Sequence, residues 1–284
     1  MKKTFILWVI ALIVIALNGC NNSSSLVETT TRETEESITT TKEVITTKEN
    51  IITHTQDTIL TGTIWETEVH YFESNIEGPK VTIVGGIHGD ELAGWNAALR
   101  LLEKEGYFIG TVMIIPKANI QGCNAQQRYP GMGEPYNGYT YHDLNRNFPG
   151  VEDGNVTQRI AFEIVKVITE FEPDHVIDLH ESRHSYSYGG KYIGNQIIYG
   201  NGYSSVIGYD IVDDFNTRYL KEGEEVFCVD TYAPGGSFNS YFGALYKKAC
   251  VFTIETNREL ELSRRIEQQL ELLDCMFNYF WNKI

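Results

Sequence analysis

The chain has 284 residues and a formal net charge of −15, which is enough length for one large domain or two small ones. No basic patch for a phosphate backbone is visible in the sequence, so the composition argues against nucleic-acid binding. The acidic balance indicates solubility rather than a particular partner.

Residues 1–20 have the pattern of a secretory signal. A positive start precedes an apolar run from Phe5 to Leu17, which is shorter than the roughly 20 residues of a spanning helix. The pair Gly19-Cys20 resembles a bacterial lipobox. We therefore expect Cys20 to carry a lipid, to become the mature N-terminus and to anchor an exported lipoprotein to the outer face of a bacterial cell membrane. An uncleaved membrane anchor is the alternative.

Residues 21–56 are rich in Ser, Thr and Glu and have no hydrophobic period. Such a segment cannot bury enough apolar surface to offset its ordering entropy, so we expect a disordered linker. A single catalytic domain is then expected over residues 57–284. Its four cysteines form no CxxC pair, and an exported domain permits either disulfides or buried free thiols at Cys123, Cys228, Cys250 and Cys275.

Strand-like and helix-like segments alternate along this domain. A strand or hairpin is expected over Ile59–Phe72, and short apolar strands are expected over 81–84, 111–115, 176–181, 196–199, 225–229 and 250–255. Helical patterns are expected over 92–105, 157–171, 207–219, 238–247 and 260–281. Residues 119–155 show no hydrophobic periodicity, so we expect a long loop there. A loop of this length in a compact domain is usually functional. The order predicts an α/β fold with a mixed, largely parallel central sheet flanked by helices.

The run Gly85-Gly86-Ile87-His88-Gly89-Asp90-Glu91 lies between the expected strand 81–84 and the helix that follows. Sites in parallel sheets lie outside the carboxyl ends of the strands. A His and a Glu three residues apart can there face one point, and both are zinc ligands. A catalytic zinc needs a third protein ligand, and His180 ends its own expected strand. Asp178 or a backbone carbonyl could hold the other nitrogen of that imidazole.

Four motifs stand in the order found in zinc carboxypeptidases. They are His-Gly-Asp-Glu (88–91), Asp-Leu-Asn-Arg-Asn-Phe-Pro-Gly (143–150), Asp-Leu-His-Glu (178–181) and Thr-Ile-Glu (253–255). The longer run 85–94 and the run Ile-Pro-Lys-Ala-Asn (115–119) more closely resemble the succinylglutamate desuccinylase/aspartoacylase branch of that superfamily. The resemblance covers about residues 80–284.

This resemblance implies a hydrolytic zinc site with one Zn²⁺ per chain. The implied metal ligands are His88, Glu91 and His180. Glu255 would act as general base and proton shuttle, and Arg128 would stabilise an oxyanion. The implied grip on a substrate carboxylate comes from Asn145 and Arg146, because a planar guanidinium suits bidentate binding. Carboxypeptidases also carry a Tyr four residues before a Gly-Gly-Ser; here that position is Thr231, so Tyr232 either fills the role or does not.

Two functions remain open. The first is a zinc metallohydrolase that cleaves an amide bond in a carboxylate-bearing substrate, either a small N-acyl amino acid or a peptide. The resemblance favours the acyl amino acid, whereas the expected export favours a peptide. The second is an inactive, zinc-containing lipoprotein that binds peptides. Glu255 separates them, because a binding protein has no need of a base.

Overall fold

The computed structural model describes residues 49–104, 106–129, 142–186, 191–231 and 233–282, all within the unit Thr47–Ile284. Its strands, in chain order, are β1 (Ile52–Ile59), β2 (Thr67–Ser74), β3 (Lys80–Gly85), β4 (Thr111–Ile115), β5 (His175–Ser182), β6 (Gln196–Tyr199), β7 (Cys228–Asp230) and β8 (Cys250–Asn257). Its helices are α1 (Leu92–Leu101), α2 (Ile120–Ala125), the 3-10 helix η1 (Leu144–Arg146), α4 (Val156–Phe171), α5 (Gly202–Arg218), α6 (Phe238–Leu245) and α7 (Leu262–Asn282).

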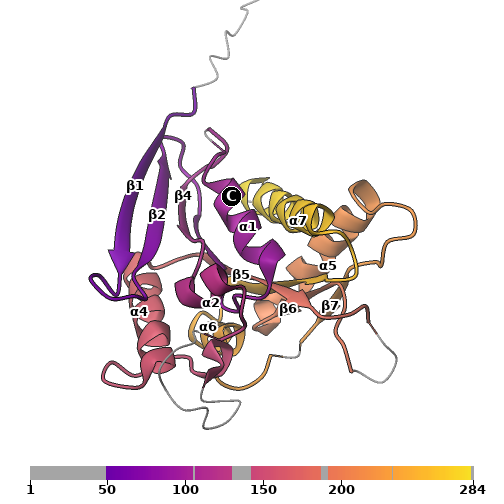
Figure 1. The fold of residues 1–284 in the computed structure, drawn as a ribbon. Helices are drawn as coiled ribbons and strands as arrows, with labels where there is room; N and C mark the ends of the chain where they lie inside the picture. The colour runs from indigo at the N-terminus through magenta and orange to yellow at the C-terminus, as the bar shows by residue number, and fades with distance from the viewer. Residues whose placement is uncertain (1–48, 105, 130–141, 187–190, 232, 283–284) are drawn as a thin grey trace, which may run out of the picture. The chain divides into compact units, whose positions relative to one another are not determined.

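All eight strands form one mixed sheet in the order β1-β2-β4-β3-β5-β8-β6-β7 (Figure 1). The centre, β4-β3-β5-β8, is parallel, whereas β1, β2 and β6 join their inner neighbours in antiparallel fashion. The predicted α/β fold with a largely parallel central sheet is therefore confirmed. Parallel strands run in one direction, so β3, β5 and β8 end at the same edge of the sheet.

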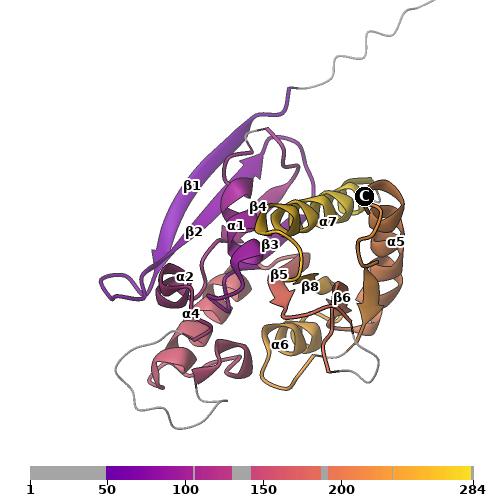
Figure 2. The same ribbon diagram turned by 45° about the vertical axis from the view of Figure 1, so that its right-hand side comes forward.

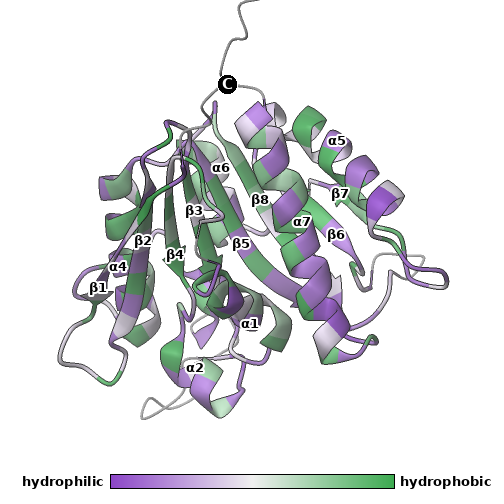
Figure 3. Ribbon diagram, turned by 90° about the horizontal axis from the view of Figure 1, so that it is seen from above, coloured by the Kyte–Doolittle hydropathy of each residue, from purple (hydrophilic) through white to green (hydrophobic). Residues whose placement is uncertain are grey.

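Helices cover both faces of this sheet. One apolar core joins it to α1, α5 and α7, and a second core on the other face joins it to α4 and α6. Figure 2 shows α7 and α6 on opposite sides of β5 and β8. The central strands are mostly hydrophobic along their length (Figure 3). Burial on both faces explains why these strands read as continuous apolar runs in the sequence.

The folded domain begins earlier than the sequence predicted. Strand β1 starts at Ile52, so residues 52–56 belong to the sheet rather than to the expected linker. This strand lies at the edge of the sheet, and five consecutive residues in it, 53–57, are exposed. Their polar composition resembles that of the linker because a solvated edge strand buries little apolar surface. The remaining linker residues and the signal segment, 1–48, lie outside the described residues.

The long loop predicted over 119–155 contains two short helices, α2 and η1, among its described residues. Asn119 caps α2 by accepting a hydrogen bond from the backbone of Gly122, and Asp143 caps η1 through the backbone of Asn145. Neither helix is long enough to show a hydrophobic period, so the sequence pattern missed both. The helix η1 brings Asn145 and Arg146 toward the carboxyl edge of the sheet.

The described cysteines are free, with Cys228 exposed and the other three buried. The sequence had left disulfides and buried thiols open, and the structure favours thiols. Within the described ranges, no helix combines the length and apolar character needed to cross a bilayer.

Candidate metal centre and active site

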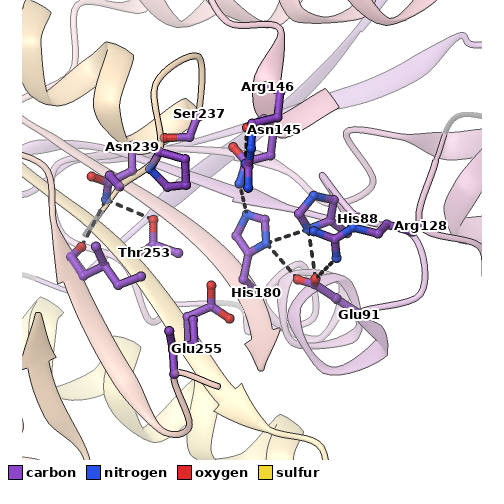
Figure 4. Close-up of a pocket in the computed structure, with 14 residues that line it drawn as sticks. His88, Glu91, Arg128, Asn145, Arg146, His180, Ser237, Asn239, Thr253 and Glu255 are labelled. Carbon is purple, nitrogen blue, oxygen red and sulfur yellow. Dashed lines mark hydrogen bonds and ion pairs between the residues drawn. The ribbon is translucent and has the colours of Figure 1, made fainter. Parts of the chain in front are cut away.

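The turn after β3 positions the first two candidate ligands. Gly86 has φ of +73°, a conformation that L side chains rarely adopt, and a Cβ there would lie 2.6 Å from the Cys123 sulfur. This bend turns the chain from β3 into α1. Glu91 is the N-cap residue of α1, yet its carboxylate does not cap the helix. It faces His88 and His180 instead (Figure 4).

The imidazoles of His88 and His180 converge on the Glu91 carboxylate. The His88 Nδ1 atom lies 2.9 Å from Oε1 of Glu91, and the His180 Nδ1 atom lies 2.7 Å from Oε2. The two Nδ1 atoms are 3.1 Å apart. All three residues are at most 3% exposed, so three donor atoms meet in a buried space.

The outer nitrogens of both rings face carboxylates. The His88 Nε2–H donates to Oδ1 of Asp143 at 2.9 Å, and the His180 Nε2 atom lies 2.9 Å from Oδ2 of Asp178. A proton on each Nε2 leaves a lone pair on each Nδ1, directed at the shared point. Two imidazole lone pairs and one carboxylate are the donor set of a catalytic zinc site, so these residues fit the ion.

The electrostatics of these groups follow from burial and mutual attraction. Burial by itself lowers the pKa of His180, but attraction to Glu91 and Asp178 raises it well above its usual value. Burial by itself raises the pKa of Glu91, but the two histidines hold it well below its usual value. For Asp143, burial is likewise outweighed by the His88 hydrogen bond, and the pKa falls to about 2. The cluster therefore retains negative carboxylates that favour a bound cation.

Glu255 reaches the same space from the neighbouring strand. It pairs with His180 across the β5–β8 ladder, so both side chains project from the same face of the sheet. Figure 4 shows its carboxylate pointing toward the space beside His180. Burial raises its pKa to about 8. A carboxyl group with a pKa near neutrality can both accept and release a proton.

The remaining predicted residues line the same pocket. Arg128, with a side chain 18% exposed, donates from Nη1 to Oε1 of Glu91 at 2.8 Å. Asn145 uses its Oδ1 to accept the Phe238 backbone N–H at 2.8 Å, and its Nδ2 lies 3.5 Å from Nε2 of His180. Arg146 donates to the carbonyl of Asn145 at 2.6 Å. The full lining consists of His88, Glu91, Arg128, Asn145, Arg146, His180, Ile193, Ile198, Ala233, Pro234, Ser237, Asn239, Thr253 and Glu255.

Tyr232 lies outside the described residues, between two residues that the structure describes, Thr231 and Ala233. His184, four residues after His180, is exposed and lies 3.2 Å from a carboxylate oxygen of Glu259, away from the pocket lining. Glu181, directly after His180, is buried.

Glu181 supports the site from behind. Its backbone N–H donates to Oε2 of Glu91 at 2.9 Å, and its own carboxylate accepts the Ala93 N–H at 3.1 Å in the first turn of α1. Arg265 on α7 pairs with the other carboxylate oxygen. Glu181 thus takes over a capping role that Glu91 leaves open. The sequence placed this residue beside a ligand but gave no sign of its partners, which come from α1 and α7.

Parts of the chain resemble known proteins. Residues 77–189 match the family model described as the succinylglutamate desuccinylase/aspartoacylase catalytic domain. Residues 77–189 belong to this catalytic-domain family. The matched segment of the desuccinylase/aspartoacylase domain runs from before β3 to beyond β5. It contains every candidate ligand as well as Arg128 and the Asn145-Arg146 pair, whereas Glu255 lies outside it.

Individual relatives cover parts of the chain. The N-alpha-acetyl-L-2,4-diaminobutyric acid deacetylase of Halomonas elongata is 39% identical over 107 residues, which are 37% of this chain and 29% of that protein. The tripeptide-bound Cell Shape Determinant protein Csd4 of Helicobacter pylori has a TM-score of 0.61 at 19% identity, covering 81% of this chain and 55% of Csd4. A succinylglutamate desuccinylase from Silicibacter sp. TM1040 has a TM-score of 0.58 at 18% identity, covering 82% of this chain and 68% of that chain. The two solved structures share the fold of this desuccinylase/aspartoacylase domain.

Proposed function

We propose that the chain is a zinc-dependent hydrolase that cleaves an amide bond in a small, carboxylate-bearing substrate. The observation that carries this proposal is the convergence of two imidazole nitrogens and one carboxylate, with Glu255 beside them. The family match and the name of the Halomonas deacetylase support amide hydrolysis.

The proposed mechanism assigns one task to each side chain. His88, Glu91 and His180 would hold one zinc ion, which supplies Lewis-acid chemistry and favours a deprotonated water near neutral pH. The Glu255 carboxylate takes a proton from the attacking water and delivers it to the leaving nitrogen. Its burial supports this task, because an acid with a raised pKa is a stronger base once deprotonated.

The polar wall opposite Glu255 would orient the substrate. The guanidinium of Arg128 lies near the ligands and can offset negative charge that develops on the scissile carbonyl oxygen. The Asn145 amide is held by the Phe238 backbone through its oxygen, so its Nδ2 hydrogens face the pocket. Together with the Arg146 guanidinium, it would bind a substrate carboxylate by charge-assisted hydrogen bonds.

The substrate class is the finer part of the proposal. An N-acyl amino acid fits the branch to which residues 77–189 belong and the name of the Halomonas relative. The export that we expect from residues 1–20 favours a short peptide instead. A mass-spectrometric screen of acyl amino acids against short peptides separates the two, since only one class should be consumed at substrate concentrations near KM.

Glu255→Gln tests the catalytic proposal. The substitution keeps the size of the side chain and removes its basicity, so we expect kcat to fall by at least about 10²-fold with about one zinc per chain retained. Turnover would be followed with the substrate found in the screen, and zinc by elemental analysis.

Full turnover in this variant would contradict the assignment of Glu255 as the base. His180→Ala is the companion variant, and it should lose the zinc instead. A wild-type protein that binds zinc but consumes nothing in the screen would favour the peptide-binding lipoprotein.

A further inference from the structure

A line of polar side chains runs from the floor of the pocket to His180. Asn239 on α6 and Thr253 on β8 both line the pocket, and both are at most 5% exposed. Figure 4 shows the Asn239 amide directed at the Thr253 hydroxyl. Thr253 in turn contacts Asp178, whose second oxygen lies 2.9 Å from Nε2 of His180.

The sheet register explains why these residues meet. Across the β5–β8 ladder, Asp178 pairs with Thr253, and two positions further on His180 pairs with Glu255. Side chains two residues apart on a strand share a face, so all four project on the same side of the sheet. That side faces α6, which brings Asn239 to Thr253.

The direction of each hydrogen bond in this line is fixed by chemistry. The Asn239 Nδ2 group can only donate, and it does so to Oγ1 of Thr253 at 2.9 Å and to the Ile198 carbonyl at 3.1 Å. The Thr253 hydroxyl therefore accepts from Asn239 and has its own proton free for Oδ1 of Asp178. The other oxygen of Asp178, Oδ2, is buried without a hydrogen-bond partner among the described residues and lies 2.9 Å from Nε2 of His180, so a proton on Nε2 would supply the partner that this oxygen lacks.

We propose that Asn239 and Thr253 are positioning residues that fix His180 as a metal ligand. By orienting Asp178, they hold the proton of His180 on Nε2 and leave the Nδ1 lone pair for the cation. The competing arrangement has Nε2 accept from Nδ2 of Asn145, but that contact is longer, 3.5 Å, and uncharged. This proposal deepens the proposed function, because it rests on a metal at the His88, Glu91 and His180 cluster.

The line also joins the pocket floor to the ligand. Helix α6 begins directly after its N-cap Ser237, which lines the pocket, and its Phe238 N–H donates to the Asn145 side chain. The first turn of α6 thus positions two side chains. It holds Asn145, a proposed substrate-binding residue, and it carries Asn239, which begins the line of polar side chains to His180. A single rigid element thereby aligns the substrate with the metal ligand.

Thr253→Val tests the proposal, because valine keeps the shape of threonine and removes the hydroxyl. We expect the zinc dissociation constant, measured by competition with a chromophoric chelator, to rise about tenfold. In ¹⁵N-labelled, zinc-loaded protein, the Nε2–H proton of His180 should exchange with solvent faster than in the wild type. Thr253→Ser keeps the hydroxyl and should restore both values.

Thr256→Val is the matched control. It removes another buried hydroxyl from β8, one that accepts from Gln269 at 3.1 Å and lies outside the line to Asp178. We expect a loss of stability similar to that of Thr253→Val but an unchanged zinc affinity. Asn239→Leu should weaken zinc binding, and combining it with Thr253→Val should add little, because both act through the same carboxylate.

Zinc affinity and proton exchange in Thr253→Val equal to those of the wild type would overturn the proposal, as would equal losses of zinc affinity in Thr253→Val and Thr256→Val. These outcomes differ from a failure of the proposed function. If the wild type binds zinc and hydrolyses nothing, the affinities of the variants still decide the positioning role. A wild-type protein that binds no zinc would overturn both proposals.

Discussion

At the scale of single residues, the site depends on carboxylates that face histidines from outside. Asp143 lies against Nε2 of His88, and Asp178 lies against Nε2 of His180. The Nδ1 atom of each ring is therefore directed at Glu91. Neither aspartate would bind the metal, yet each sets the orientation of a ring that would. The sequence suggested Asp178 for this task because it lies two residues before His180. Asp143 lies 55 residues from His88, and only the fold brings the two together.

Arg146→Lys tests the binding of a substrate carboxylate. Lysine keeps the charge but loses the planar fork, so we expect KM to rise by about tenfold or more with a smaller change in kcat. This magnitude corresponds to one charge-assisted hydrogen bond, about 1.5–3 kcal/mol. The measurement is a steady-state assay with the substrate and with its carboxamide analogue.

The analogue serves as the control, because it lacks the charge that Arg146 would bind. The arginine and lysine enzymes should process it at similar rates. An equal loss on both compounds would show that Arg146 acts elsewhere than on the carboxylate.

His175 provides a pH-dependent term in stability, away from the site. Its ring stacks on Phe280 with 3.8 Å between ring centroids, and its Nδ1 accepts the Cys250 backbone N–H at 3.3 Å. Burial lowers its pKa to about 4, from 6.5 in an unfolded chain. The unfolded state therefore binds a proton first, and the folded state loses stability as the pH falls from about 6.5 to about 4.

His175→Asn is the matching variant, since asparagine can accept the same hydrogen bond and does not titrate. The free energy of unfolding of the wild type should fall relative to the variant by about 2–3 kcal/mol between pH 7 and pH 4. Urea denaturation at several pH values measures the difference. Parallel curves would mean that His175 titrates normally in the folded state.

At the scale of secondary structure, helix α1 and strand β5 together position the candidate metal ligands Glu91 and His180. Glu91 begins the helix and His180 lies near the end of the strand, so the two elements must pack closely. Gly94 permits this, because a Cβ at that position would lie 2.4 Å from the Leu179 carbonyl oxygen. The absence of a side chain there is a condition for bringing the two ligands together.

Gly94→Ala should therefore reduce both stability and zinc affinity. Displacing α1 from β5 costs about 1–3 kcal/mol in a packed core and moves Glu91 away from His180. Gly208→Ala on α5 is the control, since its Cβ would come no closer than 3.3 Å to a Phe252 ring carbon and 3.4 Å to a Val229 methyl group, and alanine favours a helix. Thermal unfolding and zinc titration should separate the two variants. A Gly94→Ala protein with wild-type zinc affinity would contradict the close-packing explanation.

At the scale of the whole molecule, the proposed site is assembled from segments spread over most of the domain. In the sheet, β3 and β5 lie side by side between β4 and β8, although β4 and β8 are far apart in the sequence. Strand β8 is therefore the direct neighbour of β5. This crossover places Glu255 next to His180, 75 residues earlier in the chain. The sheet begins with β1 at Ile52, and the signal segment that we expect over residues 1–20 lies outside the described residues.

Cys20→Ala tests the proposed membrane anchor. We expect the wild type, expressed in a bacterial host, to incorporate a labelled fatty acid and to sediment with membranes, whereas the variant should do neither. Cys228→Ala is the control, because this cysteine is exposed within the folded domain and should have no role in lipidation. An unlabelled wild type that still sediments with membranes would favour the uncleaved anchor.

The amino-acid sequence by itself determined the local elements and the chemical types at their ends. Continuous apolar runs predicted β3, β4, β5, β6 and β8, because strands buried on both faces carry no alternation. A His or Glu at the end of such a run predicted a ligand or a base, because parallel strands end at one edge. The edge strand β1 escaped this reasoning because its exposed residues are polar like the linker, and the helices α2 and η1 escaped it because they are too short to show a hydrophobic period.

Only the tertiary structure decided which side chains touch. The register of β5 against β8 placed Thr253 on Asp178 and Glu255 beside His180, and the packing of α6 brought Asn239 to Thr253. Contacts of this kind depend on strand order and on helix placement, which local sequence patterns do not encode. The candidate metal ligands could thus be named from the sequence, whereas the side chains that hold them in place became visible only in the fold.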